Sequence, residues 1–290
     1  MKEYLKYLAA AALLLLFLPF LLTVLLSGKE SVEIRREPDA EMLLPVTVCR
    51  EVPEEAPEAL LQAQAILARS RLLAEDQKKN FSRFLEENME YEQQYRMSPE
   101  FLERCRQAVA DTAGLVLTVG GKAVEAPYFS SGSGKTRDGG EAMGTETYAW
   151  IVSVDSSADT GSPDYSREIR MSEKKAAELL GGQLYDDSSG QKEIFSQLAV
   201  LSTDSAGYVT EMEVGGSRLS GEKFRQILGL PSSCFTVQEE EGELIFLCRG
   251  RGHGLGMSQY GAAAMAREGK TAEEILMHYF PQASVTQIQD

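Results

Sequence analysis

Apolar residues change their spacing along the chain, and the change separates expected helices from expected strands. Over residues 58–73 they recur at helical spacing among residues that favour helix. Ser98 and Pro99 stand in cap and first-turn positions and predict a second helix that ends near Thr112. Short apolar runs bounded by glycine or acidic turns predict strands instead. The expected strands are 42–48, 115–119, 123–129, 150–154, 194–203, 209–214, 235–237 and 243–247, and further helices are expected over 172–180, 222–228, 259–267 and 271–280.

The order of these elements predicts the fold class. Helices flank strands that are joined mostly by short hairpin links, which favours an α+β fold over a doubly wound sheet. Gly120 and Gly121 supply the two-residue turn of one such hairpin. Residues 130–144 are dominated by small and polar side chains and predict a loop. We therefore expect one mixed globular domain over residues 41–290.

The N-terminus predicts a membrane anchor. Lys2 and Lys6 precede an uncharged stretch, residues 8–26, which is long enough to cross a bilayer. It exceeds a typical signal-peptide core and no clear small-x-small cleavage site follows, so an uncleaved anchor is favoured over a cleaved signal. The positive flank predicts a cytoplasmic N-terminus. The expected protein is a single-pass cell membrane protein with an anchor over 1–27, a linker over 28–40 and an extracytoplasmic domain.

The net charge and the cysteine spacing argue against some kinds of partner and metal site. A net charge of −15 and a pI near 4.8 argue against nucleic acid or an anionic membrane surface as the main partner. The four cysteines could form up to two disulfides in an exported chain or remain buried thiols, and both alternatives stay open. None of them has the C-x-x-C spacing of a metal cluster. Neither a metal nor another cofactor is expected. The cysteines are Cys49, Cys105, Cys234 and Cys248.

Two glycine-rich stretches differ in what they indicate. Residues 132–136 end in Gly-Lys-Thr, but Phe129 stands where a phosphate loop needs its first glycine, so nucleotide binding is rejected. Residues 250–256 hold four alternating glycines, a spacing too dense for a strand and suited to close backbone approach. His253 lies at the centre of that second stretch, and two polar side chains follow it. It therefore predicts part of a functional site.

The second stretch closely resembles the C-terminal signature of the stage II sporulation protein D family, which includes amidase enhancers. The resemblance implies an exported, membrane-anchored lytic transglycosylase that cuts peptidoglycan between N-acetylmuramic acid and N-acetylglucosamine. It implies 1,6-anhydro products, a role in septal wall remodelling and engulfment during sporulation, and stage II sporulation proteins P and M as companions. The matching blocks are RGRGHGLGMSQYGA at 249–262, the helical residues 265–280, EVP at 51–53, AQAILARS at 63–70, the segments 126–136 and 221–230, and together they span roughly 39–290.

Two glutamates are the expected acids. Glycosidic cleavage needs a carboxylic acid to protonate the leaving oxygen. A lytic transglycosylase uses the sugar's own 6-hydroxyl as nucleophile, so one Glu can act as acid and then as base. Glu51, expected at a turn after a strand, matches the family's glutamate and is the first choice. Glu58 is the second, because relatives carry a Glu where an ungapped alignment here places Ala59. A solvated acidic turn is the alternative for both.

Polar residues in the matching blocks are expected to contact sugar. They are Arg69, Ser130, Ser131, Thr136, Arg249, His253, Ser258, Gln259 and Tyr260. Arg69 has a structural ion pair as an equal alternative, and a hydrogen-bonded core histidine is the alternative for His253. For the whole protein, the competing hypothesis is a non-catalytic glycan-binding partner that enhances an amidase. Anhydromuramyl products from a digest would distinguish the two hypotheses.

Overall fold

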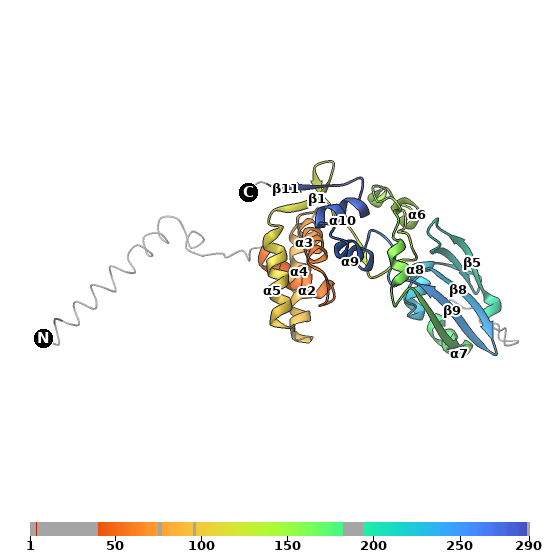
Figure 1. Ribbon diagram of the computed structural model, residues 1–290. Helices are drawn as coiled ribbons and strands as arrows, with labels where there is room; N and C mark the ends of the chain where they lie inside the picture. Colours follow the sequence, from red (N-terminus) through yellow and green to blue (C-terminus); the bar gives the residue numbers. More distant parts are fainter. Residues whose placement is uncertain (1–3, 5–39, 75–76, 95–96, 182–193, 289–290) are drawn as a thin grey trace, which may run out of the picture. The chain divides into compact units, whose positions relative to one another are not determined.

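The computed structural model describes residues 4, 40–74, 77–94, 97–181 and 194–288 (Figure 1). The contacts divide the chain into Met1–Met42 and a compact unit, Leu43–Asp290. No helix within the described ranges is both long and apolar enough to span a membrane. The expected anchor over residues 8–26 and most of the linker lie outside those ranges.

Four helices form the N-terminal part of the compact unit. They are α2 (Leu44–Glu51), α3 (Glu58–Leu73), α4 (Gln77–Gln94) and α5 (Pro99–Asp111). The alanine-rich α3 is central because α2, α4 and α5 all pack against it. Ser98 caps α5 by accepting a hydrogen bond from Phe101 N at 3.1 Å. The predicted helices over 58–73 and from Ser98 onward are therefore confirmed.

The strand predicted over residues 42–48 is wrong, because most of this stretch belongs to helix α2. Pro45 lies in the first turn of the helix, where its missing N–H costs nothing. Thr47 and Val48 are fully buried, and Thr47 donates its hydroxyl hydrogen to Leu43 O at 3.0 Å. Packing against α3 and α5 outweighs the strand preference of β-branched residues. Glu51 is consequently the last residue of a helix.

The strands form four small sheets in the described part of the chain. All neighbouring strands are antiparallel except β3 and β10, which are parallel. This mixture of helices and mostly antiparallel strands is consistent with the predicted α+β class. The sheets are β11 (Ser284–Gln287), β1 (Leu115–Val119) and β2 (Lys122–Ala123); β10 (Met257–Ser258) and β3 (Tyr128–Phe129); β4 (Ser166–Ser172), β9 (Glu243–Arg249) and β8 (Phe235–Glu240); and β5 (Leu198–Thr203), β6 (Val209–Val214) and β7 (Ser217–Ser220).

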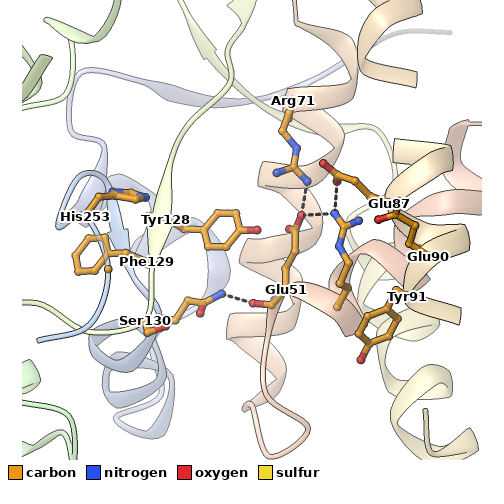
Figure 2. Close-up of a pocket in the computed structure, with 12 residues that line it drawn as sticks. Glu51, Arg71, Glu87, Glu90, Tyr91, Tyr128, Phe129, Ser130 and His253 are labelled. Atoms are coloured by element: carbon orange, nitrogen blue, oxygen red, sulfur yellow. Dashed lines mark hydrogen bonds and ion pairs between the residues drawn. The ribbon is translucent and has the colours of Figure 1, made fainter. Parts of the chain in front are cut away.

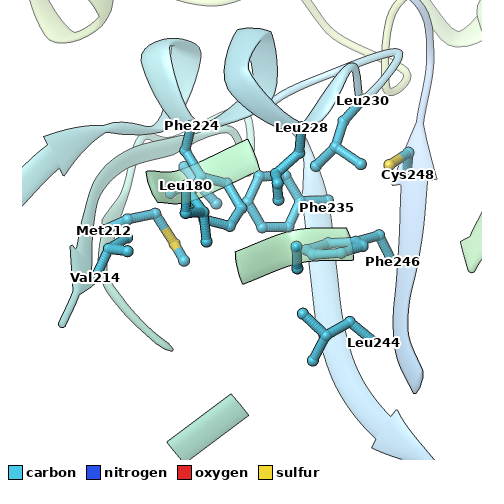
Figure 3. Close-up of a cluster of buried hydrophobic side chains, with 12 residues drawn as sticks. Leu180, Met212, Val214, Phe224, Leu228, Leu230, Phe235, Leu244, Phe246 and Cys248 are labelled. Atoms are coloured by element: carbon cyan, nitrogen blue, oxygen red, sulfur yellow. The ribbon is translucent and has the colours of Figure 1, made fainter. Parts of the chain in front are cut away.

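A hydrophobic cluster lies between two of these sheets and the helices α7 (Glu173–Leu180) and α8 (Gly221–Leu228). The rings of Phe224, Phe235 and Phe246 meet there with centroids 5.6 to 6.1 Å apart (Figure 3). Ser172 and Ser220 cap the two helices through their side chains, as their sequence positions predict. This cluster supports β9, which leads the chain into the glycine-rich stretch.

Three further predictions need correction. Residues 150–154 form no strand, since their conformation is irregular there. The second hairpin strand stops at Ala123, and β3 instead pairs with the distant β10. The loop predicted over 130–144 contains the short helix α6 (Gly139–Met143). Strands β4, β7 and β11 were not predicted, because short strands depend on partners that local pattern cannot locate.

The C-terminal helices follow the glycine-rich stretch directly. Ser258 caps α9 (Gln259–Arg267), and Thr271 and Glu274 form a capping box at the start of α10 (Ala272–Tyr279). Both helices are confirmed close to the predicted bounds. The described residues also contain 3-10 turns at Ala40–Leu43, Glu146–Tyr148, Ser157–Gly161 and Ile194–Gln197.

Candidate functional site

The glycine-rich stretch runs in close contact with residues 127–132, which comprise β3 and the residues on either side of it. Its four glycines all have positive φ, between 71° and 115°. A Cβ at Gly256 would lie 2.1 Å from Pro127 O, and one at Gly252 would lie 2.8 Å from Phe129 Cβ. Ser131 and Arg251 exchange two backbone hydrogen bonds, at 3.1 and 2.8 Å. Glycine is therefore required here, because a side chain would force the two segments apart.

A pocket of about 660 Å³ lies beside this stretch. One wall comes from the glycine-rich stretch, from β3 and from the start of α9, and the other comes from α2, α3 and α4 (Figure 2). Pockets of this size accommodate small-molecule or oligomeric ligands. The lining residues are Arg50, Glu51, Arg71, Glu87, Glu90, Tyr91, Tyr128, Phe129, Ser130, Gly252, His253 and Gln259.

Glu51 is the most constrained carboxylate in this pocket. Its side chain is only 4% exposed, and Arg71 binds its Oε1 in a close ion pair (Figure 2). Arg50 Nη2 lies 3.3 Å from the same oxygen, and Gln64 Nε2 donates to Oε2 at 2.8 Å. These charged and polar donors fix the carboxylate at the pocket wall and stabilise its negative charge.

Tyr128 completes the surroundings of Glu51. It reaches across from β3 into the pocket that Arg71 and Glu51 also line (Figure 2). Burial, and then the charge of Glu51, raise the pKa of Tyr128 above its ordinary value, so its hydroxyl remains protonated. Burial alone would lower the pKa of Arg71. The charge of Glu51 and their hydrogen bond together outweigh burial, so the pKa of Arg71 lies above its ordinary value. The group is therefore a connected set of donors around one carboxylate.

Gln259 connects the two walls of the pocket. Its Nε2 donates to the backbone oxygen of Glu51 at 2.6 Å, across 208 positions of the sequence. Gln259 is the first residue of α9, immediately after the cap residue Ser258. The turn that begins α9 therefore holds the C-terminal end of α2 in place, and with it the position of Glu51.

His253 lies on the wall opposite Glu51 (Figure 2). Its Nδ1 accepts a hydrogen bond from Leu255 N at 3.1 Å, so in the neutral ring the proton is on Nε2. The ring meets Phe129 edge-on, with centroids 5.8 Å apart. Burial lowers the pKa of His253, although Glu222 opposes this shift. The lowered pKa favours a neutral imidazole at neutral pH.

The burial of His253 predicts a pH effect on stability. The pKa of His253 in the folded protein is below the unfolded value of about 6.5. The stability that the buried neutral ring contributes is therefore fully present above pH 6.5, and it is lost as the pH falls toward the folded pKa, because only the unfolded chain takes up the proton. In His253→Asn the amide oxygen can accept the Leu255 hydrogen bond without titrating. We expect the melting temperature of the variant to fall less than that of the wild type between pH 7.5 and pH 5, as measured by calorimetry.

The control for this experiment is His278→Asn, because His278 lies outside the pocket and contacts Asp155 O through its ring. That variant should follow the wild-type pH curve more closely than His253→Asn does. Parallel curves for wild type and His253→Asn would show that burial of His253 contributes no pH dependence.

Five of the predicted sugar contacts line one of two adjoining pockets. Ser130, His253 and Gln259 line the pocket of Glu51. Ser131 and Tyr260 line a second pocket of about 390 Å³, which shares Ser130 and Gln259 with the first. The structure therefore brings these five residues together around two adjoining pockets, the first of which contains Glu51.

Arg69 does not reach either pocket. It is 1% exposed and donates to Val109 O and Leu115 O, both at 3.1 Å. The guanidinium instead ties α3 to α5 and β1, which is the structural alternative to the predicted substrate contact. Arg71 is the arginine of this helix that lines the pocket. Two positions along an α-helix turn a side chain by about 200°, which explains why these two arginines point to different sides.

Three other predicted contacts serve the fold or lie elsewhere. Thr136 is fully buried and accepts a hydrogen bond from Val154 N at 2.9 Å. Ser258 is also fully buried and donates to Asp159 Oδ1 at 2.6 Å. Arg249 is exposed at the end of β9 and lines a different pocket. None of these three residues lines the pocket of Glu51 or the pocket that adjoins it.

Glu58 is separate from the pocket of Glu51. It begins α3, its side chain is 47% exposed, and Arg104 Nη2 lies 3.4 Å from its carboxylate. An acidic residue in the first turn complements the helix dipole. The surroundings of Glu58 match the alternative of a solvated acidic turn. Of the two expected acids, only Glu51 lies in the pocket formed by α2 and the glycine-rich stretch.

Several pocket residues were not predicted. Arg71 and Arg50 bind Glu51, Tyr128 faces it from β3, and Glu87 Oε2 lies 2.6 Å from Arg50 Nη2. Only their location in the sequence could have pointed to two of these residues. Arg50 adjoins Glu51, and Tyr128 falls within a block that resembles the family. Among the described residues, no group of three or more His, Cys, Asp or Glu side chains is placed to hold a metal ion.

Comparison with known proteins supports the predicted resemblance. Residues 29–119 match the family model described as Stage II sporulation protein. The chain is 33% identical over 187 residues to Stage II sporulation protein D of Bacillus amyloliquefaciens and 32% identical over 187 residues to that of Bacillus subtilis strain 168. Each alignment covers 64% of this chain and 52% of the relative, so the chain spans about half the length of these relatives. It is also 25% identical over 226 residues to a protein named Amidase enhancer from Bacillus subtilis, covering 62% of this chain and 32% of that protein.

Proposed function

We propose that the protein is a sporulation protein that acts on peptidoglycan as a membrane-anchored lytic transglycosylase, because residues 29–119 match the Stage II sporulation protein model and the chain is similar to Stage II sporulation protein D. The bond cleaved is the one between N-acetylmuramic acid and N-acetylglucosamine, and the product has a 1,6-anhydro end. Stage II sporulation proteins P and M are the proposed companions, and residues 8–26 are the proposed anchor. The proposed setting is septal wall remodelling and engulfment.

The observation that carries the proposal is the position of Glu51. It is a single buried carboxylate on one wall of an open polar pocket, and the glycine-rich stretch forms the opposite wall. In the proposed reaction, protonated Glu51 gives its proton to the leaving glycosidic oxygen. The resulting carboxylate then accepts the proton of the 6-hydroxyl as that oxygen bonds to C1. One residue serves both steps, and its proton is restored at the end.

The two arginines impose a condition on this reaction. Arg50 and Arg71 stabilise the negative charge of Glu51 in the structure, whereas the first step requires its acid form. N-acetylmuramic acid carries a carboxylate of its own when it has no stem peptide. We propose that this carboxylate draws the guanidinium groups away from Glu51 as the sugar binds, which frees the Glu51 side chain for the leaving oxygen.

The test is an end-group analysis of digested peptidoglycan. The full chain is incubated with purified glycan strands, and the products are separated by chromatography and identified by mass spectrometry. We expect anhydromuramyl ends to accumulate without a matching rise in reducing ends. A rise in reducing ends would instead indicate hydrolysis by water and would contradict the proposed reaction.

Two observations support a second function. The chain is similar to the amidase enhancer, and the carboxylate of Glu51 is occupied by ion pairs with arginine. In this alternative the pocket binds glycan and increases the activity of a cell-wall amidase without cleaving the strand. The two functions separate when a purified amidase is added. Enhancement that persists in Glu51→Gln, with no anhydro ends from the wild type, would favour the enhancer.

A further inference from the structure

Asp159 is a fully buried carboxylate that lines neither of the two adjoining pockets. It belongs to the 3-10 turn Ser157–Gly161. Ser258 Oγ donates a hydrogen bond to its Oδ1 at 2.6 Å, and Gly132 N and Ser156 Oγ each donate to its Oδ2 at 2.8 Å. A buried carboxylate needs donors of this kind, and two of these donors lie 27 and 99 positions away in the sequence.

The neighbouring hydrogen bonds show that the hydroxyl groups around Asp159 act as donors. Ser258 Oγ accepts a hydrogen bond from Gly261 N at 3.2 Å and gives its own hydrogen to Asp159. Because Ser156 also gives its hydrogen to the carboxylate, the hydroxyl of Tyr279, 3.1 Å away, is the donor to Ser156 Oγ. Burial raises the pKa of Asp159, and the hydrogen bonds oppose this shift. Donors on all sides are the surroundings that an ionised carboxylate requires.

Two glycines leave the space that this network occupies. A Cβ at Gly132 would lie 2.7 Å from Asp159 Oδ2. A Cβ at Gly261 would lie 2.8 Å from Ser156 Oγ and still closer to the hydroxyl of Tyr279. Neither glycine has a positive φ, so the backbone conformation itself would tolerate a side chain. A larger residue at either position would instead displace part of the network.

The network holds the wall of the pocket that faces α2. Ser258 caps α9, and Gln259, the first residue of that helix, donates to the backbone oxygen of Glu51 at 2.6 Å. Asp159 therefore binds the start of α9 on one side, while the end of α2 binds it on the other. The backbone donor Gly132 directly follows the two serines that line the second pocket. One carboxylate thus joins both segments of this wall.

We propose that Asp159 is a positioning residue for Glu51. It does not touch the substrate. It fixes the start of α9 against the segment after β3, and the hydrogen bond from Gln259 then fixes the C-terminal end of α2, which carries Glu51. The effect on cleavage rests on the proposed function. The position of α2 is a property of the folded chain, and it is measured without any substrate.

Asp159→Asn tests the proposal, because the amide keeps the shape of the side chain while its nitrogen cannot accept a hydrogen bond. The measurement is hydrogen–deuterium exchange of the full chain, resolved by peptide. We expect the peptides that contain Gly132, Gly261 and Val52 to exchange about tenfold faster than in the wild type. Val52 N donates to Val48 O at the end of α2, so its exchange reports the effect on the helix that carries the proposed acid.

Asp155→Asn is the matched control, because it makes the same chemical change just before the same 3-10 turn. Asp155 is exposed, and its Oδ2 accepts hydrogen bonds from Ser157 N at 3.3 Å and Ser157 Oγ at 2.9 Å. Exchange of all three peptides should stay within about twofold of the wild type. An unchanged Val52 peptide in folded Asp159→Asn, or equal acceleration in Asp155→Asn, would overturn the proposal.

Ser156→Ala decides the question if Asp159→Asn does not fold. It removes one donor to Asp159 and leaves the cap made by Ser258 in place. The same three peptides should exchange about three- to tenfold faster than in the wild type, because one hydrogen bond to the carboxylate is lost. A Val52 peptide that exchanges at the wild-type rate in this variant would show that the network does not position α2.

The kinetics of cleavage give a second readout. In Asp159→Asn we expect kcat for anhydromuramyl release to fall by about 10–100-fold and KM to stay within about threefold of the wild type, because the position of Glu51 changes and the sugar contacts do not. A raised KM with an unchanged kcat would contradict the positioning role. If the wild type itself releases no anhydro ends, the proposed reaction fails, and the exchange measurement alone decides the role of Asp159.

Discussion

Glu51→Gln is expected to reduce the formation of 1,6-anhydro ends by on the order of 10³-fold, because the amide cannot donate and then retrieve a proton. Glutamine keeps the size of the side chain, and its single amide oxygen can still accept the hydrogen bond that Arg71 donates to Oε1 in the wild type. The hydrogen bond from Gln64 to the other oxygen is lost, because the amide nitrogen cannot accept it. Initial rates of anhydromuramyl release measure the effect. A rate within a few-fold of wild type would remove Glu51 from the reaction.

Loss of stability must be separated from loss of catalysis in this variant. Removing one partner of a buried ion pair costs about 3–5 kcal/mol, and Glu51 pairs with Arg71 at low exposure. Rates are therefore compared at a temperature where thermal unfolding shows the variant to be folded. Glu58→Gln is the matched control, since Glu58 is exposed and paired only at 3.4 Å with Arg104. It should cleave at close to the wild-type rate.

Gly256→Ala is expected to produce the largest loss of stability, at least about 3 kcal/mol. Gly256 has φ of 82°, and an added Cβ would lie 2.1 Å from the backbone oxygen of Pro127. A backbone atom cannot rotate away, so the glycine-rich stretch must separate from the segment before β3. Chemical denaturation followed by circular dichroism measures the change.

A control variant separates the cost of the steric contact with Pro127 from the cost of a positive φ at alanine. Gly216 has nearly the same φ, 81°, but an added Cβ there would meet nothing within 4 Å. Gly216→Ala should therefore cost only about 1 kcal/mol, the cost of a positive φ at a non-glycine residue. Equal losses in the two variants would mean that the contact with Pro127 does not stabilise the fold.

Local signals in the sequence predicted a large part of the fold. Ser98, Ser172, Ser220 and Thr271 each cap a helix where expected, because a cap is a hydrogen bond between near neighbours in the chain. The strand predicted over 42–48 failed for the opposite reason. Its β-branched residues favour a strand locally, and only burial against α3 and α5, which local pattern does not contain, makes the stretch helical.

The site was predictable in part through the resemblance to a family. That resemblance pointed to Glu51 and to the wall around His253, which the structure places on opposite sides of one pocket. It also pointed to Arg69, whereas the pocket arginine is Arg71. Which side of α3 faces the pocket depends on how α3 packs against its neighbours. Similarly, Tyr128 acquires its role only when β3 pairs with β10.

The most direct test of the central claim is a crystal structure of Glu51→Gln with a bound tetrasaccharide of alternating N-acetylglucosamine and N-acetylmuramic acid. We expect the scissile glycosidic oxygen to lie within hydrogen-bonding distance of the residue 51 amide. The sugar should contact the wall formed by Tyr128 and His253, with Arg50 or Arg71 turned toward a muramyl carboxylate. A tetrasaccharide bound away from this pocket, with both arginines still directed at residue 51, would contradict it.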